Sequence, residues 1–249
     1  MKMTILPAVL FVGALLPSAT VGGEQSNDPR AGKLALEVAE KGWIAYSSKT
    51  KNGTWDIILS RPDGSNVRNL TDTSGFDEAA PRFSPDGQQM LYRQLKKGSQ
   101  INHDNWGFQG RLVIARADGS DPTIVGEEKE FPWASWSPDG KQVACLSLKG
   151  IEIVDLATKK VVRKLPRKGF YQQLFWSPDG RWFCGTSNNF GESWTIARMN
   201  AETGEVNAVH SFRNCTPDWF GDSSHVIFSH RPGGQTDNKG YGWTQLWMA

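Results

Sequence analysis

The sequence of 249 residues contains little that would indicate redox, nucleic-acid or serine-hydrolase chemistry. Its three cysteines, Cys145, Cys184 and Cys215, follow no spacing typical of zinc sites or thioredoxin-like motifs. The formal net charge is only +2, whereas nucleic-acid binding usually needs a strongly basic surface. No Gly-x-Ser-x-Gly turn occurs, which argues against an α/β-hydrolase nucleophile. We therefore predict no cofactor and no nucleic-acid partner.

Long hydrophobic runs are also missing, apart from one at the N-terminus. Residues 5–16 form an apolar stretch that follows Lys2 and precedes the small-residue segment 17–19. This order of charged, apolar and small residues is typical of a secretory signal, and the run is too short to span a bilayer. A buried N-terminal strand or helix is the alternative. We predict a signal peptide over residues 1–22, a linker over 23–41, and a periplasmic or secreted protein with no membrane span after signal removal.

What the sequence does contain is a repeated turn. Ser-Pro-Asp-Gly occurs three times after an aromatic residue and before an apolar strand, at residues 83–87, 136–140 and 176–180. Residues 219–223 form a degenerate fourth copy. Proline fixes φ, aspartate accepts backbone N–H groups and glycine adopts the left-handed conformation, so each copy predicts a tight turn. The spacing approaches the period of about 40–45 residues expected for a four-stranded propeller blade.

The repeat therefore predicts an all-β fold, a β-propeller of four-stranded antiparallel blades over residues 42–249. If the strands of a blade are lettered a to d, Ser-Pro-Asp-Gly joins a to b, and turns such as Asp118-Gly119-Ser120 join c to d. Counting strands gives about four and a half blades, so we expect an incomplete ring. The positions predicted to be structural are Phe83, Asp86, Trp136, Asp139, Trp176, Asp179, Trp219 and Asp222.

With this pattern in place, the chain resembles the WD-like propeller repeats of the TolB family. The matching segments are FSPDGQQMLY, WSPDGKQVACLS, WSPDGRWFCGTS and the hairpin SRPDGSNVRNLT at residues 60–71. The resemblance covers roughly residues 42–249 and implies a propeller fold. The family places an α/β domain between the signal and the propeller, whereas only a short segment intervenes here. The resemblance is therefore strong for architecture and weak for function, and the family's binding of Pal carries over poorly.

Two b–c connections are too long for simple turns, at residues 95–110 and 230–242. In a propeller, the b–c and d–a loops emerge on one face, and loops held on a rigid scaffold usually carry binding. Tolerated insertions without a function are the alternative. We predict that a protein or glycan partner docks on this loop face. The residues expected to contact the partner are His103, Asp104, Trp106, Phe108, Arg231 and Tyr241.

Catalysis is the competing hypothesis. Under the preferred hypothesis, we predict no catalytic residue and no metal-binding residue. Residues 221–225 resemble a serine nucleophile turn, but the fifth residue is not glycine and the segment lies on a repeat turn. A carbohydrate-active lyase or hydrolase with a metal on the loop face would need clustered histidines. This alternative predicts that His103, His210 and His230 converge within about 5 Å. The preferred function is a non-catalytic, exported binding scaffold of the cell envelope.

Overall fold

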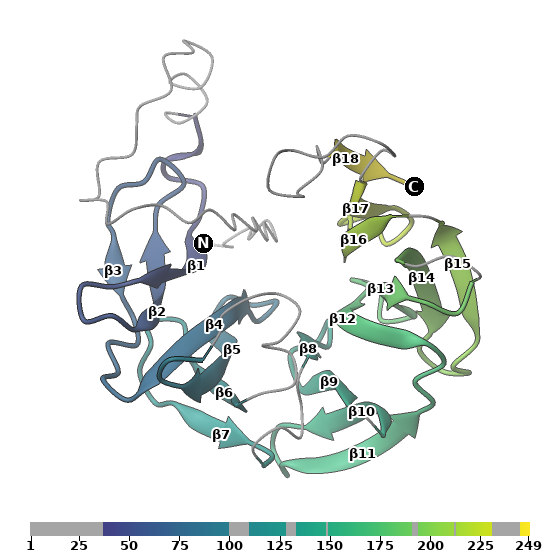
Figure 1. Ribbon diagram of the computed structural model, residues 1–249, viewed down its shortest axis with the longest axis horizontal. Coiled ribbons are helices and arrows are strands. Elements are labelled where there is room, and N and C mark those ends of the chain that lie inside the picture. The colour runs from purple at the N-terminus through teal and green to yellow at the C-terminus, as the bar shows by residue number, and fades with distance from the viewer. Residues whose placement is uncertain are drawn as a thin grey trace. The chain divides into compact units, whose positions relative to one another are not determined.

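The computed structural model describes residues 37–99, 110–127, 133–147, 149–190, 194–211, 213–230 and 245–249. Its strands form five separate antiparallel sheets, and each sheet is built from strands that are consecutive in the sequence (Figure 1). Small up-and-down sheets of this kind are the blades of a propeller. The prediction of an all-β propeller is therefore confirmed. The chain divides into two compact units, which are described in turn.

The first unit takes in two sheets. The three described strands of the first sheet lie in the order β1 (Ile44–Lys49), β2 (Trp55–Ser60) and β3 (Arg68–Asn69). The second sheet has four strands, β4 (Phe76–Phe83), β5 (Gln89–Lys96), β6 (Arg111–Arg116) and β7 (Thr123–Val125). Ile57, Met90, Tyr92, Val113 and Ala115 form a buried core cluster of this unit.

The second unit takes in three sheets. The first contains β8 (Trp133–Trp136), β9 (Gln142–Ser147), β10 (Gly150–Asp155) and β11 (Lys160–Leu165). The next contains β12 (Phe170–Trp176), β13 (Trp182–Ser187), β14 (Thr195–Asn200) and β15 (Val206–His210). The last contains β16 (Asn214–Trp219), β17 (Val226–His230) and β18 (Gln245–Met248). All three cysteines lie in this unit, and their side chains are buried.

The repeat serine organises each Ser-Pro-Asp-Gly turn. The buried Ser137 Oγ donates to Asp139 Oδ1 at 2.6 Å and accepts from the backbone N of Gln142 at 2.9 Å. Gly140 closes the turn at a φ of 70° with its N–H on the Ser137 carbonyl. The turns that begin at Ser84 and Ser177 repeat the same bonds. The serine hydroxyl lowers the pKa of the aspartate, as it does for Asp86.

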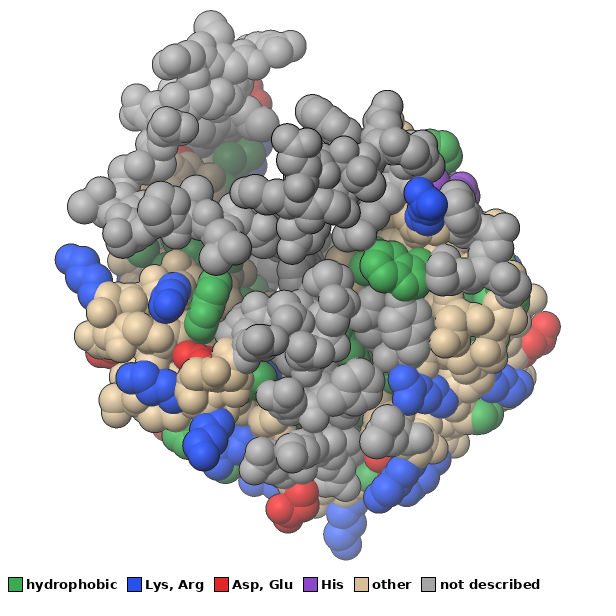
Figure 2. All heavy atoms as spheres, in the orientation of Figure 1, with side chains coloured by type: hydrophobic (Ala, Val, Ile, Leu, Met, Phe, Trp, Pro, Cys, Tyr) green, Lys and Arg blue, Asp and Glu red, His purple; other side chains and the backbone are tan. Residues whose placement is uncertain are grey.

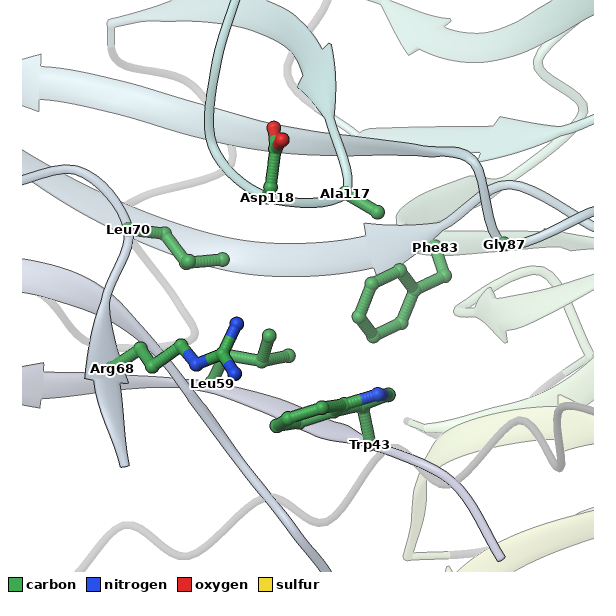
Figure 3. A pocket seen from close by; sticks show the side chains of 8 residues that line it. All are labelled: Trp43, Leu59, Arg68, Leu70, Phe83, Gly87, Ala117 and Asp118. Atoms are coloured by element: carbon green, nitrogen blue, oxygen red, sulfur yellow. The ribbon is translucent and has the colours of Figure 1, made fainter. Parts of the chain in front are cut away.

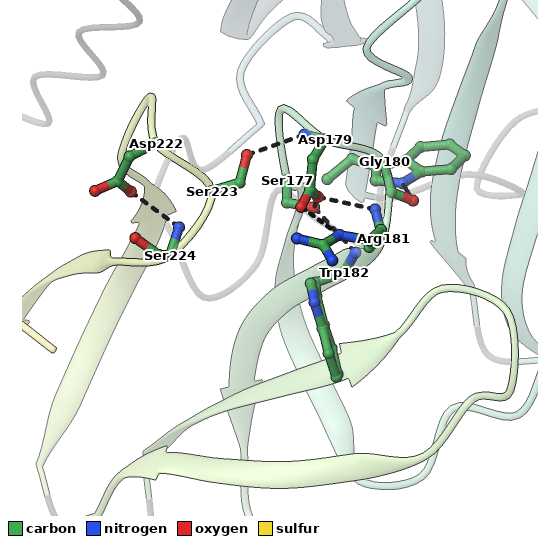
Figure 4. Close-up of polar contacts among 9 residues, drawn as sticks. Ser177, Asp179, Gly180, Arg181, Trp182, Asp222, Ser223 and Ser224 are labelled. Atoms are coloured by element: carbon green, nitrogen blue, oxygen red, sulfur yellow. Dashed lines mark hydrogen bonds and ion pairs between the residues drawn. The ribbon is translucent and has the colours of Figure 1, made fainter.

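The degenerate fourth turn uses the same backbone geometry with different residues. Ser223 occupies the glycine position at a φ of 61°, and its N–H donates to the Phe220 carbonyl. Asp222 accepts from the backbone N of Ser224 at 2.9 Å, which is the main cause of its lowered pKa. The hydroxyl of Ser223 reaches the neighbouring turn and accepts from the Asp179 N at 3.0 Å (Figure 4). Neighbouring turns of this unit are thus joined directly.

The repeat aromatics are buried to different extents. Trp136 and Trp219 are buried, with 7% and 6% of their surfaces exposed, whereas Phe83 and Trp176 are half-buried. Trp219 Nε1 donates to the Phe175 carbonyl of the preceding sheet at 3.1 Å. Trp176 Nε1 instead donates to the carbonyl of Gly180 in its own turn at 2.8 Å. The shared repeat position therefore serves packing between sheets in one copy and turn closure in another.

A β-bulge interrupts the first strand of three sheets. Each bulge lies beside a left-handed residue three positions before the repeat aromatic, and these residues are Ala80, Gln173 and Thr216. Positive φ is costly for residues other than glycine, above all for β-branched Thr216. The buried Gln173 compensates in the second unit, because its Oε1 accepts from the Thr216 N at 2.9 Å and from Thr186 Oγ1 at 3.0 Å.

We predict that Trp219→Ala lowers the free energy of unfolding by about 3–5 kcal/mol, the usual cost of truncating a buried aromatic residue. Trp219 packs with Phe175, Ile196 and Phe228 in a core cluster. Phe220 is the matched control, because it is the next residue and 49% exposed. Phe220→Ala should change stability little. Equal losses for the two variants in denaturant titrations would contradict the assignment of Trp219 to the core.

Candidate functional site

The residues predicted to contact a partner all belong to the two long b–c connections. His103, Asp104, Trp106, Phe108, Arg231 and Tyr241 lie outside the described residues. The structure does describe where these connections leave the sheets, at the end of β5 and at the end of β17. We call these two places the loop roots. Their geometry shows how firmly the connections are attached.

The β5 root is held by one buried carboxylate. Asp77 in β4 is 1% exposed, and its two oxygens bind different segments of the first unit. Its Oδ1 accepts from the backbone N of Trp55, at the start of β2, and its Oδ2 accepts from the backbone N of Gly98, both at 2.8 Å. Because bonds from backbone N–H groups to a carboxylate are strong, Asp77 fixes the first residues of the long connection to the neighbouring sheet.

A second buried acid lies next to Asp77. Glu78 is fully buried, and its Oε1 accepts from Thr73 Oγ1 at 2.6 Å and from Gln94 Nε2 at 2.9 Å. Burial raises the pKa of Glu78, and the negative charge of Asp56 raises it further. Asp56 is also fully buried and accepts from Asn69 Nδ2 at 2.5 Å. Side-chain donors therefore hold Glu78 and Asp56, whereas backbone N–H groups hold Asp77.

The β17 root is held by a buried amide between two imidazoles. Asn214 in β16 is fully buried, and its Oδ1 accepts from His230 Nδ1 at 2.8 Å. Its Nδ2 donates to both the carbonyl and Nδ1 of His210, each at 3.1 Å. The Trp247 ring covers this pair, with centroids 4.7 Å from His230 and 5.4 Å from His210. Asn214 therefore fixes the end of β17 to β15 of the preceding sheet.

The amide also fixes the tautomers of the two histidines. Because Asn214 Nδ2 can only donate, His210 Nδ1 carries a lone pair, and the neutral ring has its proton on Nε2. His230 has the opposite tautomer, with the proton on Nδ1 and the lone pair on Nε2. A metal bound through both Nε2 atoms would break the bond between Asn214 and the His210 ring. The geometry thus weighs against this pair as metal ligands.

The predicted convergence of three histidines is tested only in part. The ring centroids of His210 and His230 lie 5.6 Å apart, and His103 is outside the described residues. Within the described ranges, no group of three or more His, Cys, Asp or Glu side chains is arranged to hold a metal ion. His225 lies apart from this pair, since its Nδ1 bonds the turn residue Asp222 at 2.6 Å.

Sequence reasoning missed Asp77, Asn214 and their partners. The signal that could have found them is the presence of polar residues at the start of two buried strands. β4 begins Phe-Asp-Glu and β16 begins with asparagine, although the first residues of a buried strand are expected to be apolar. Sequence also gave no hint of a pocket near Trp43 in the first unit. On the face seen in Figure 2, the coloured Lys and Arg side chains are scattered rather than gathered in one patch.

The fold and its repeated turns define a β-propeller of WD-like repeats, and comparison with known proteins specifies their type. No family model matches the chain. Over 60 residues, the chain is 43% identical to the Tol-Pal system protein TolB of Roseobacter denitrificans, a match that covers 22% of this chain and 13% of that protein. The crystal structure of TolB from Acinetobacter baumannii superposes with a TM-score of 0.64 at 20% identity, over 87% of this chain and 56% of that chain. The chain carries a TolB-type β-propeller.

Two enzymes share the fold. A puromycin hydrolase superposes with a TM-score of 0.58 at 18% identity, over 83% of this chain and 33% of that chain. An oligogalacturonate lyase in complex with manganese superposes with a TM-score of 0.53 at 15% identity, over 78% of this chain and 54% of that chain. Similarity at this level of identity shows the fold and does not carry a function. No helix in the described ranges has the length and hydropathy needed to cross a membrane.

We predict that protonation of the β17 root destabilises the protein in mild acid. Burial lowers the pKa of His230, and repulsion from His210 when that ring is protonated lowers it further. A lowered pKa favours the neutral ring in the folded state, so stability is lost as the pH falls through the unfolded value of about 6.5. Urea titrations at pH 7.5 and 5.5 should show a larger loss for the wild type than for His230→Gln. His225→Gln, at an exposed histidine, is the control. Equal losses for the wild type and His230→Gln would contradict the prediction.

Proposed function

We propose that the chain is an exported TolB-type propeller that acts as a non-catalytic binding scaffold of the cell envelope. The proposed partner, a protein or a glycan, contacts residues of the β5–β6 connection and residues of the β17–β18 connection. Export rests on the signal-like pattern of residues 1–22. Binding is supported by one observation above all: both long connections leave the scaffold at roots that buried polar side chains hold in place.

Firm roots favour binding for an energetic reason. Association costs free energy when loops have to be ordered, and pre-organised attachment points reduce that cost. Asp77 and Asn214 supply such attachment points, and both residues lie in strands rather than in the connections. The connections carry Trp106, Phe108 and Tyr241 beside charged residues, which is the usual composition of an interface hot spot. The match to a Tol-Pal system protein supports a partner in the envelope.

Replacing residues 100–108 with a short Gly-Ser linker should abolish partner binding. The replacement leaves Gly98 and its bond to Asp77 intact, so the melting temperature should stay close to that of the wild type. The measurement is recovery of a defined partner from envelope extracts by tagged protein, with thermal melting as the check on folding. Glu202→Ala, in the exposed β14–β15 turn, is the control and should keep the partner. Recovery of the same partner without the loop would place the binding surface elsewhere.

A second variant tests the root rather than the loop. Asp77→Asn replaces one acceptor oxygen with an NH₂ group, which cannot accept from the backbone N of Trp55 or Gly98. If a firm root matters, this variant should weaken partner binding although every loop residue remains. Asp86→Asn changes an exposed turn aspartate in the same way and should leave binding unchanged. Equal binding by the two variants would remove the root from the proposal.

A metal-dependent lyase or hydrolase is the alternative function. One observation favours it, the close approach of His210 and His230 in a fold that a manganese-containing lyase shares. The bond from Asn214 to His210 Nδ1 opposes it. The alternative predicts that Mn²⁺ raises the melting temperature of the wild type and that His230→Gln removes the effect. The scaffold proposal predicts no such shift.

A further inference from the structure

A pocket of about 220 Å³ opens in the first unit, away from the loop roots. It lies where the β4–β5 and β6–β7 turns meet the β1–β3 sheet, and Gly87 and Asp118 of these turns line it (Figure 3). The long β5–β6 connection leaves the opposite end of the same sheet. The pocket is therefore separate from the proposed loop surface, and the two can be tested independently.

The pocket is apolar inside and aromatic on one wall. Leu59, Leu70 and Phe83 supply aliphatic and aromatic surface, and the indole of Trp43 faces them across the space (Figure 3). Its volume is below the roughly 300–1,000 Å³ typical of sites for drug-sized ligands. The occupant is therefore about the size of one large apolar side chain.

Two cations lie against the same indole. The guanidinium carbon of Arg61 is 3.9 Å from the centroid of the Trp43 ring, and that of Arg68 is 5.1 Å from it. One of the N–H groups of Arg61 is already used, since its Nη1 donates to the Gly42 carbonyl at 3.1 Å. The exposed Arg68 also lines the pocket, and it forms no ion pair with another described residue. Its N–H groups are therefore available to an anion.

The lining also contains one acid, Asp118. The Asp118 carboxylate points away from Trp43 and Phe83 (Figure 3). Its Oδ1 accepts from the backbone N of Ser120 at 3.0 Å and from Ser120 Oγ at 2.6 Å, so it is used within its own turn. The pocket thus combines an apolar interior with one cation, Arg68, and one anion, Asp118, in its lining.

We propose that this pocket binds a small carboxylate with an aromatic or aliphatic body. The carboxylate pairs with Arg68, whose planar fork matches the geometry of two carboxylate oxygens. The body of the ligand packs between Trp43 and Phe83, where the loss of water from apolar surface favours binding. A free organic acid and the C-terminal apolar residue of a peptide share this chemistry.

The test uses ligand-observed NMR and calorimetry with 3-phenylpropionate, its neutral amide, and N-acetylphenylalanine as a mimic of a peptide C-terminus. The carboxylates should bind the wild type at least about tenfold more tightly than the amide, because the pairing with Arg68 needs an anion. Binding of both acids assigns a site for free acids. Binding of N-acetylphenylalanine alone assigns a peptide C-terminus. Failure of both acids to bind, or equal binding of the amide, would overturn the proposal.

Variants locate the binding. Arg68→Gln should weaken 3-phenylpropionate about tenfold or more, and Arg68→Lys should have a smaller effect, because it keeps the charge and loses the fork. Arg198→Gln is the matched control, since Arg198 stacks on Trp182 at 4.6 Å in the second unit without lining this pocket. Unchanged binding by Arg68→Gln would overturn the assignment. If that variant did not fold, the comparison of acid and amide binding to the wild type would still show whether the pocket requires a carboxylate.

Discussion

The hydroxyl of the repeat serine is the interaction on which three of the five sheets depend. Ser137 Oγ joins the aspartate of its turn to the first backbone N–H of the next strand, so one buried atom fixes where β9 begins. Since side chains alternate between faces, a shift of one residue would turn every core side chain of that strand to the opposite face. The same bonds at Ser84 and Ser177 set the register of β5 and β13. The core thus follows from a local hydrogen bond repeated in successive sheets.

The two ends of the sheets are built on different principles. At the turn end, the hydrogen bonds of each motif join residues no more than five positions apart. The exposed aspartates of these turns have a lowered pKa because a serine hydroxyl donates to them. At the loop end, different residues and hydrogen bonds hold the two roots. Asp77 binds two backbone N–H groups, whereas Asn214 bridges two imidazoles. Variation at one end of a repeated frame agrees with the proposal that this end carries the binding.

The sequence was sufficient for the fold because the fold is repetitive and local. Turn residues, aromatic positions and strand patterns recur, so each copy supports the interpretation of the others. The roots were not predictable, because Asp77 contacts Trp55 and Gly98, which are adjacent to it only after two sheets have packed. Burial of single repeat positions also depends on context. Trp219 reaches the carbonyl of Phe175 in the neighbouring sheet, while the equivalent Trp176 bonds its own turn and stays half-buried.

The bulges explain how one strand serves both ends. In β4 and β16, one extra residue lies opposite the partner strand, beside the left-handed Ala80 and Thr216. An extra residue reverses the faces of the residues before it relative to those after it. The turn motif therefore sets the direction of the aromatic side chain after the bulge, but it does not set the direction of Asp77 or Asn214 before it. Because of the bulges at the strained residues Ala80 and Thr216, the pairing register at the turn end does not determine which side chains face the core at the loop end. Polar roots can then be buried without disturbing the repeated core.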